Sequence, residues 1–91
     1  MRKFQSPYGT LVLTAERMRH ILKFHPDTRT CVRYFASTLK EPELAVSSVR
    51  DPEAVICYRY LAQQKRYLAI VVHINKRFVI TAYLAKRTKS R

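Results

Sequence analysis

The chain has 91 residues and a mass of 10.7 kDa, which suffices for one domain with one modest hydrophobic core. A hydrophobic content of 47%, with one glycine and four prolines, excludes a disordered or a fibrous chain. The 18 Lys and Arg residues outnumber the six Asp and Glu residues, so the formal net charge is +12. A polyanion is therefore the first partner that we expect.

The charges are unevenly distributed along the chain. All six acidic residues precede residue 54, so the segment 54–91 is basic and has no carboxylate side chain of its own. We expect a single domain over residues 1–91 whose last residues, 86–91, form a flexible basic tail.

The cysteines and the hydrophobic runs indicate the compartment. Cys31 and Cys57 lie in apolar contexts without the spacing of a metal or redox motif, so both are expected to be reduced core residues. No secretory leader follows Met1, and no apolar run approaches the roughly 20 residues of a membrane span. A cytoplasmic protein that does not cross a membrane is expected.

The first half of the chain has helical features. A short strand is expected at residues 9–13, and Thr14 is a suitable N-cap for a first helix, which Pro26 ends. A second helix, capped by Asp27 or Thr28, is expected to run as far as Pro42.

Beyond Pro42 the apolar residues recur at every second position. The expected strands are 44–49, 54–61, 67–74 and 78–85, with turns at 51–53, 63–65 and 75–77. The sequence therefore predicts an α+β domain in which two N-terminal helices pack on one face of a four-stranded antiparallel sheet. The other face is expected to stay partly open.

Alternation also predicts which side chains share a face of each strand. In 54–61, Tyr58 and Tyr60 should face away from Cys57 and Arg59. In 67–74, even-numbered residues should face away from odd-numbered ones. In 78–85 the same rule places two sets on opposite sides: Phe78, Ile80, Ala82 and Leu84, against Val79, Thr81 and Tyr83.

Few enzyme chemistries are open to this composition. Six scattered carboxylates do not favour a two-metal nuclease, the three histidines lack zinc-site spacing, and one glycine excludes the glycine-rich nucleotide loops. Neither a metal nor a cofactor is expected. RNA cleavage without metal needs only a proton acceptor, a proton donor and positive charge, because the 2′-hydroxyl of the RNA is the nucleophile.

Two histidines near the end of the first helix are the candidates for proton transfer. His25 lies on the apolar stripe that includes Met18 and Leu22, whereas His20 projects away from it, among basic neighbours. The two histidines are thus expected on different faces of the helix.

Two segments resemble a known family. LTAERMRHILKFHP at 13–26 and FVITAY at 78–83 are similar to the barnase, EndoU, colicin and RelE-like nuclease superfamily, in its small phage-associated branch. The resemblance covers roughly residues 10–86 and implies a metal-independent ribonuclease, often a toxin or an effector. It implies a helix histidine, His20 before His25, as acid and base. It also implies that Arg59 clamps the phosphate and that Thr81 and Tyr83 orient the scissile group.

The expected partner is RNA, such as tRNA or ribosome-bound mRNA, cleaved to a 2′,3′-cyclic phosphate. Cations would hold phosphates and an aromatic ring would stack on a base. The expected RNA-binding residues are Arg17, Lys23, Tyr58, Lys65, Arg66, Lys76, Arg77, Lys86 and Arg87. Two alternatives stay open: a non-catalytic RNA- or ribosome-binding module, and a basic domain that grips an acidic protein such as an antitoxin or immunity protein.

Overall fold

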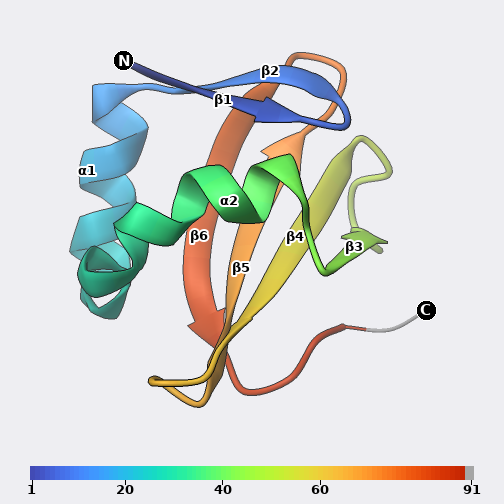
Figure 1. The fold of residues 1–91 in the computed structure, drawn as a ribbon. Helices are drawn as coiled ribbons and strands as arrows, with labels where there is room; N and C mark the ends of the chain where they lie inside the picture. The colour runs from blue at the N-terminus through green and yellow to red at the C-terminus, as the bar shows by residue number, and fades with distance from the viewer. Residues whose placement is uncertain (90–91) are drawn as a thin grey trace.

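Six strands and three helical segments make up the fold in the computed structural model, which describes residues 1–89 (Figure 1). The strands are β1 (Arg2–Ser6), β2 (Gly9–Leu13), β3 (Leu44–Ser47), β4 (Ala54–Leu61), β5 (Arg66–His73) and β6 (Phe78–Ala85). The helical segments are α1 (Ala15–Phe24), the 3₁₀ segment η1 (Pro26–Tyr34) and α2 (Phe35–Lys40). The expected α+β class is confirmed.

The sheet is larger than predicted. Its strand order is β1-β2-β6-β5-β4-β3, and every neighbouring pair is antiparallel except β2 and β6, which are parallel. The predicted antiparallel strands are present as β3 to β6. The prediction of a purely antiparallel, four-stranded sheet was wrong, because the β1–β2 hairpin extends the sheet beyond β6.

The strand predicted at residues 9–13 is present as β2, whereas its partner β1 was not predicted. Of the residues in β1, only Phe4 is buried, where its ring lies 6.5 Å from that of Phe35 in α2. The hairpin turn is closed by the hydroxyl of Ser6, which donates to the carbonyl of Gly9 at 2.7 Å and accepts from the N–H of Tyr8 at 3.1 Å. One inward-facing residue is too short a pattern to predict a strand.

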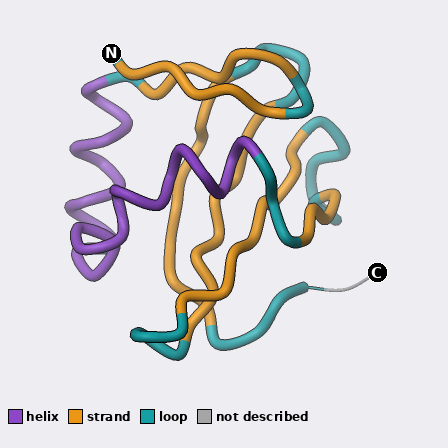
Figure 2. The backbone as a smooth tube through the Cα atoms, in the orientation of Figure 1, coloured by secondary structure: helices purple, strands orange, loops and turns teal. Residues whose placement is uncertain are grey.

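The first helix forms as predicted, and the second does not. Thr14 caps α1, since its hydroxyl accepts from the Arg17 N–H at 3.1 Å. The predicted second helix is divided into the 3₁₀ segment η1 and the α-helix α2, both of which are coloured as helix in Figure 2. Threonine hydroxyls bond back to carbonyls three residues earlier, Thr28 to His25 at 2.7 Å and Thr30 to Asp27 at 3.3 Å. Such bonds favour a tight 3₁₀ turn over an α-helix.

The two helices also differ in position from the prediction. Figure 1 shows α2 crossing one face of the sheet, whereas α1 lies beside β6 at the flank. Ile21 is the buried residue of α1 and joins the core under α2. The helices therefore do not lie side by side on one face.

The sheet separates two clusters of buried side chains. We call the side covered by α2 the helix face; its strand residues include Val55, Cys57, Leu61, Leu68, Ile70, Val72, Val79 and Ala82. We call the other side the tyrosine face; its residues are Val46, Ile56, Tyr58, Tyr67, Ala69, Val71 and Tyr83. The predicted alternation of β4 and β5 is confirmed.

The alternation predicted for β6 was wrong at one point. The register between β5 and β6 shifts between Val71 and Val72, whose partners are Thr81 and Val79. Ile80 is therefore an extra residue, as in a β-bulge. Val79 lies on the helix face, and Thr81 lies with Val71 on the tyrosine face.

Both cysteines are core residues, as predicted. Cys31 and Cys57 are free and fully buried. Burial raises the pKa of the Cys57 thiol to about 11, so it stays protonated at neutral pH. Neither thiol is accessible as a nucleophile.

The chain beyond β6 touches the tyrosine face. The N–H of Lys89 donates to the hydroxyl of Tyr58 at 3.0 Å, and Thr88 is half-buried. The segment 86–89 of the expected flexible tail is thus held at one point. The rest of that tail, residues 90–91, lies outside the described residues.

The free edge of β4 is closed by a side chain. Beyond its last partner in β3, the N–H of Tyr60 donates to Oε1 of Glu43 at 2.9 Å. The carboxylate takes the place that a carbonyl of a longer β3 would have, which protects an otherwise open strand edge.

Removing this carboxylate should destabilise the sheet edge. We expect Glu43→Ala to lower the free energy of unfolding by about 0.5–1.5 kcal/mol, because the Tyr60 N–H loses its acceptor. Glu41→Ala is the matched control: it removes the same charge, and the Glu41 side chain makes no hydrogen bond or ion pair within residues 1–89. Urea titrations of both variants measure the difference, and equal losses would contradict this role of Glu43.

Candidate nucleic-acid interface

The helix α1 is fixed against the edge of β6 by its first turn. The guanidinium of Arg17 lies 3.5 Å from the Ile80 carbonyl oxygen, a long hydrogen bond, and 5.7 Å from the centre of the Phe78 ring. Stacking of a guanidinium on an aromatic ring is favourable and restricts its orientation. Arg17 thus holds a positive charge at the start of β6.

The end of α1 places a histidine beside the end of β6. The N–H of His25 donates to the Ile21 carbonyl at 2.7 Å, and the His25 carbonyl accepts from the N–H and the hydroxyl of Thr28. Its half-buried imidazole lies against Tyr83, with the ring centres 5.9 Å apart and tilted by 42°. The backbone of His25 is therefore fixed by hydrogen bonds at both its N–H and its carbonyl.

Tyr83 is a hydroxyl donor held among other tyrosines. Burial, and then the neighbouring Tyr58 hydroxyl, raise the pKa of Tyr83 above its ordinary value of 10.0. Tyr83 is therefore protonated at neutral pH. Thr81 lies two residues earlier on the same face and is also half-buried. His25, Tyr83 and Thr81 form one group of polar side chains along β6.

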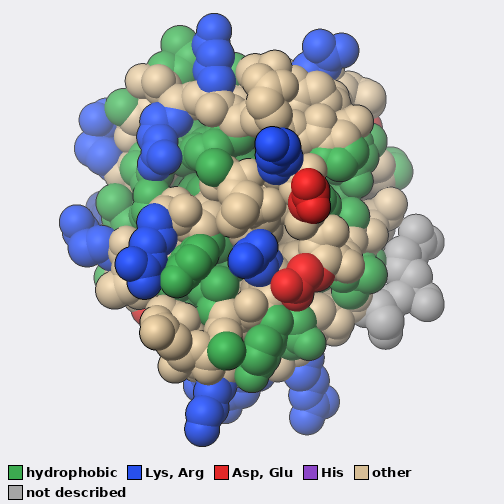
Figure 3. All heavy atoms as spheres, in the orientation of Figure 1, with side chains coloured by type: hydrophobic (Ala, Val, Ile, Leu, Met, Phe, Trp, Pro, Cys, Tyr) green, Lys and Arg blue, Asp and Glu red, His purple; other side chains and the backbone are tan. Residues whose placement is uncertain are grey.

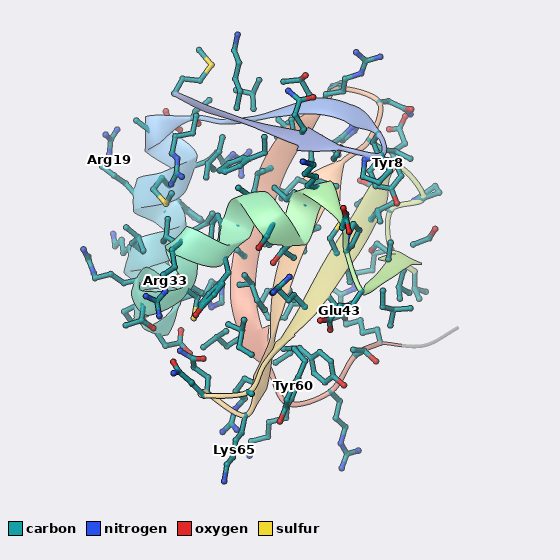
Figure 4. The ribbon with its side chains drawn as sticks, viewed as in Figure 1. Tyr8, Arg19, Arg33, Glu43, Tyr60 and Lys65 are labelled. Carbon is teal, nitrogen blue, oxygen red and sulfur yellow. The ribbon has the colours of Figure 1, made fainter. Side chains whose placement is uncertain are left out.

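His20 does not join this group. It is exposed on the outer side of α1, where its ring contacts Phe24 with the centres 4.6 Å apart. It lines an open depression with its neighbours on the helix: Glu16, Arg17, Arg19 and Lys23. Figure 4 shows Arg19 pointing away from the sheet on this side. The predicted placement of His20 and His25 on different faces of the helix is confirmed.

Arg59 is separated from the β6 group by the sheet itself. It lies opposite Leu68 and shares the helix face with it, whereas Thr81 and Tyr83 lie on the tyrosine face. A single phosphate beside Tyr83 cannot also be held by Arg59 in this structure. The constellation implied by the family resemblance is therefore brought together only in part.

The third histidine, His73, has a structural setting. Its Nδ1 accepts from the Lys76 N–H at 3.1 Å, and its Nε2 lies 3.4 Å from Glu53 Oε2. Its ring is stacked on Phe78 at 5.3 Å, and the residue is 8% exposed. These contacts hold the β5–β6 turn against the β3–β4 connection.

Tyr58 was expected to contact RNA, and the structure contradicts this. It is 1% exposed, because the neighbouring strands and the segment near Lys89 cover it. The accessible ring is that of Tyr60, 45% exposed, whose centre lies 5.1 Å from that of Tyr67. Alternation places Tyr60 on the same face as Tyr58. Tyr60 is the exposed one because β3 begins opposite Tyr58 and does not run alongside Tyr60.

The predicted cations gather at both ends of β6. The register places Tyr67 opposite Ala85, so the basic pairs that adjoin these two residues lie at one end of the sheet. These pairs are Lys65 with Arg66 and Lys86 with Arg87, while Lys76 and Arg77 form the turn at the other end. Lys23 lies on α1. Figure 3 shows Lys and Arg side chains along the α1 side and at the lower end of the molecule in that view.

Within residues 1–89, no three His, Cys, Asp or Glu side chains are grouped closely enough to hold a metal ion. None of the helices in this part of the chain is long and apolar enough to span a bilayer. Comparisons with models of protein families, with curated proteins and with solved structures found no match to the chain.

The environment of Tyr83 predicts its pH dependence. Because its native pKa is raised above 10.0, its contribution to stability is complete below pH 10.0 and is lost as the pH rises through the native pKa. In a ¹³C NMR titration of Tyr83 Cζ, we expect a midpoint above 10.0 that Tyr58→Phe moves downward. The missing resonance of Tyr83→Phe gives the assignment. A midpoint at or below 10.0 in the unaltered protein would contradict the burial argument.

Proposed function

We propose that the protein is a metal-independent endoribonuclease that acts on RNA along β6, as a toxin or an effector. The observation that carries this proposal is the imidazole of His25 beside the protonated hydroxyl of Tyr83, in a strand with cations near both ends. A proton acceptor, a proton donor and positive charge are the groups that this reaction requires.

The reaction follows from these groups. The 2′-hydroxyl of the RNA gives its proton to the neutral imidazole of His25, and its oxygen forms a bond to the adjacent phosphorus. The bond from phosphorus to the 5′-oxygen breaks, and this oxygen takes the proton of Tyr83. Solvent returns a proton to Tyr83 and removes one from His25. The products are a 2′,3′-cyclic phosphate and a 5′-hydroxyl end.

The remaining side chains position the scissile phosphate. The hydroxyl of Thr81 lies on the same face as Tyr83 and donates to a non-bridging oxygen. Arg17, held at the start of β6, attracts the phosphate chain. The proposed membership of the barnase, EndoU, colicin and RelE-like superfamily supports the same reaction, with His25 in place of His20 as the acid and base.

The location of Arg59 favours a second candidate function. Arg59, the expected phosphate clamp, lies on the helix face and not beside Tyr83. A β6 group without this clamp is compatible with a non-catalytic RNA- or ribosome-binding module. Such a module uses the same cations and the same salt-dependent affinity without cleavage. In either case, an acidic antitoxin or immunity protein would compete with RNA for this basic surface.

Substitution of the two histidines separates these functions. We expect the purified protein to cleave labelled RNA in excess EDTA, and His25→Asn to reduce the rate about 10²- to 10⁴-fold, as loss of a general base does. RNA affinity should stay unchanged. His20→Asn is the matched control, because His20 is exposed on the same helix away from β6, and its rate should stay within a few-fold of the unaltered protein.

The other outcomes are equally informative. A loss at His20 with none at His25 would transfer the acid and base role to the outer side of α1 and overturn the β6 site. Intact RNA with a clear gel shift would remove the nuclease and leave the binding module. Thermal melts of both variants control for unfolding.

A further inference from the structure

A depression lies beside the last residues of β4, where β3 no longer pairs with this strand. It encloses about 290 Å³ and is lined by Tyr34, Arg59, Tyr60, Leu61, Ala62, Gln63 and Gln64. Figure 4 shows Tyr60 and Lys65 at this end of the sheet, on the side away from the β1–β2 hairpin. Its residues Arg59 and Leu61 belong to the helix face, on the far side of the sheet from Thr81 and Tyr83, whereas Tyr60 belongs to the tyrosine face. No residue of the proposed reaction lines the depression.

Arg59 is the charged group of this depression. It is half-buried, and it makes none of the hydrogen bonds or ion pairs found among residues 1–89. Within residues 1–89 no buried side-chain nitrogen or oxygen lacks a hydrogen-bond partner, so the unbonded guanidinium nitrogens of Arg59 are reached by solvent. They are free to donate to an anion in the depression.

The other lining side chains match an anion. Gln63 and Gln64 contribute amide donors and Tyr34 contributes a hydroxyl, and no carboxylate is among the lining residues. A second guanidinium, that of Arg33, lies 5.0 Å from the centre of the Tyr34 ring. The lining residues thus offer donors and one positive charge, and the carboxylate of Glu43 next to them is bound to the backbone N–H of Tyr60.

We propose that this depression is a phosphate subsite that binds the RNA backbone through Arg59, remote from the scissile phosphate. The planar fork of an arginine binds two oxygens of one phosphate, and the fork of Arg59 has no other hydrogen-bond partner within residues 1–89. A volume of about 290 Å³ has room for a phosphate with its sugar.

The β4–β5 turn connects this subsite with the β6 group. Lys65 and Arg66 lie at the turn, directly after Gln64, and Lys86 adjoins the same end of the sheet. A single strand of RNA that leaves β6 at this end meets these cations before it reaches Arg59. The subsite rests on the proposed RNA function and extends the surface that RNA covers to the helix face.

The salt dependence of RNA affinity tests the subsite. We expect Arg59→Ala to weaken the binding of a single-stranded RNA several-fold and to reduce the slope of log K against log salt by about 0.7, the value of one lost phosphate contact. Arg50→Ala, at an exposed arginine in the β3–β4 connection, removes the same charge and should leave the slope unchanged. Arg59→Lys keeps the charge without the fork and should retain the slope with reduced affinity.

A direct probe distinguishes free phosphate from RNA backbone. In NMR titrations with inorganic phosphate and with the RNA, the Nε–Hε signal of Arg59 should shift with both, and more at equal concentration with the RNA. A shift with phosphate alone would assign the site to small phosphates, which overturns the RNA backbone as its ligand. No shift with either ligand overturns the subsite.

The failure of the subsite is distinguishable from the failure of the proposed function. If the RNA is bound and Arg59→Ala behaves like Arg50→Ala, the subsite is wrong while the β6 site stands. If the unaltered protein binds no RNA at all, the proposed function is wrong, and so is the RNA subsite. Melting curves of Arg59→Ala control for unfolding.

Discussion

The unequal pairing of β6 determines the rest of the arrangement. Along one edge β6 pairs with β5 over its whole length, but along the other it pairs with β2 only where Val12 meets Phe78. The remaining edge of β6 is free of strands, and α1 lies there with Ile21 in the core and Arg17 at the Ile80 carbonyl. Because a strand edge presents unpaired backbone groups, a helix that covers it also protects the sheet from further pairing.

The same arrangement explains where polar chemistry can occur. A helix on the edge of a sheet, unlike one on its face, ends beside the side chains of the outer strand. The turn from α1 into η1 therefore places His25 beside Tyr83, although the two residues are far apart in the sequence. The hydroxyl and the N–H of Thr28 both donate to the His25 carbonyl and so hold this turn closed beside the imidazole.

Local features of the sequence predicted the local structure well. Thr14 and Pro26 bound the first helix as expected, and strict alternation assigned both faces of β4 and β5. What was missed depends on contacts between distant segments. The parallel pairing of β2 with β6 involves Val12 and Phe78, which no periodicity connects.

The candidate site could be predicted to the same extent. Helical periodicity correctly separated His20 from His25, but the choice between them depends on how α1 docks, which the sequence of α1 does not contain. The burial of Tyr58 depends on the neighbouring strands and on the segment near Lys89, which lies 31 positions away and donates to the Tyr58 hydroxyl. Alternation predicts which residues share a face within β4 and within β6, but only the register of the sheet shows which faces of the two strands coincide. That register places Arg59 and Tyr83 on opposite faces.

The extra residue at Ile80 has a consequence for how this strand can evolve. Strand side chains alternate, so one added or removed residue exchanges inside for outside over everything that follows. The bulge absorbs Ile80, so Val79 stays in the core while Thr81, two positions later, lies on the opposite face. In a regular, unbulged β6 of the same sequence, Thr81 and Tyr83 would share the face of Val79 beneath α2, and Ala82 and Leu84 would lie on the tyrosine face. The bulge at a single position, as much as the identity of any polar residue, thus decides which face of the sheet carries these hydroxyls.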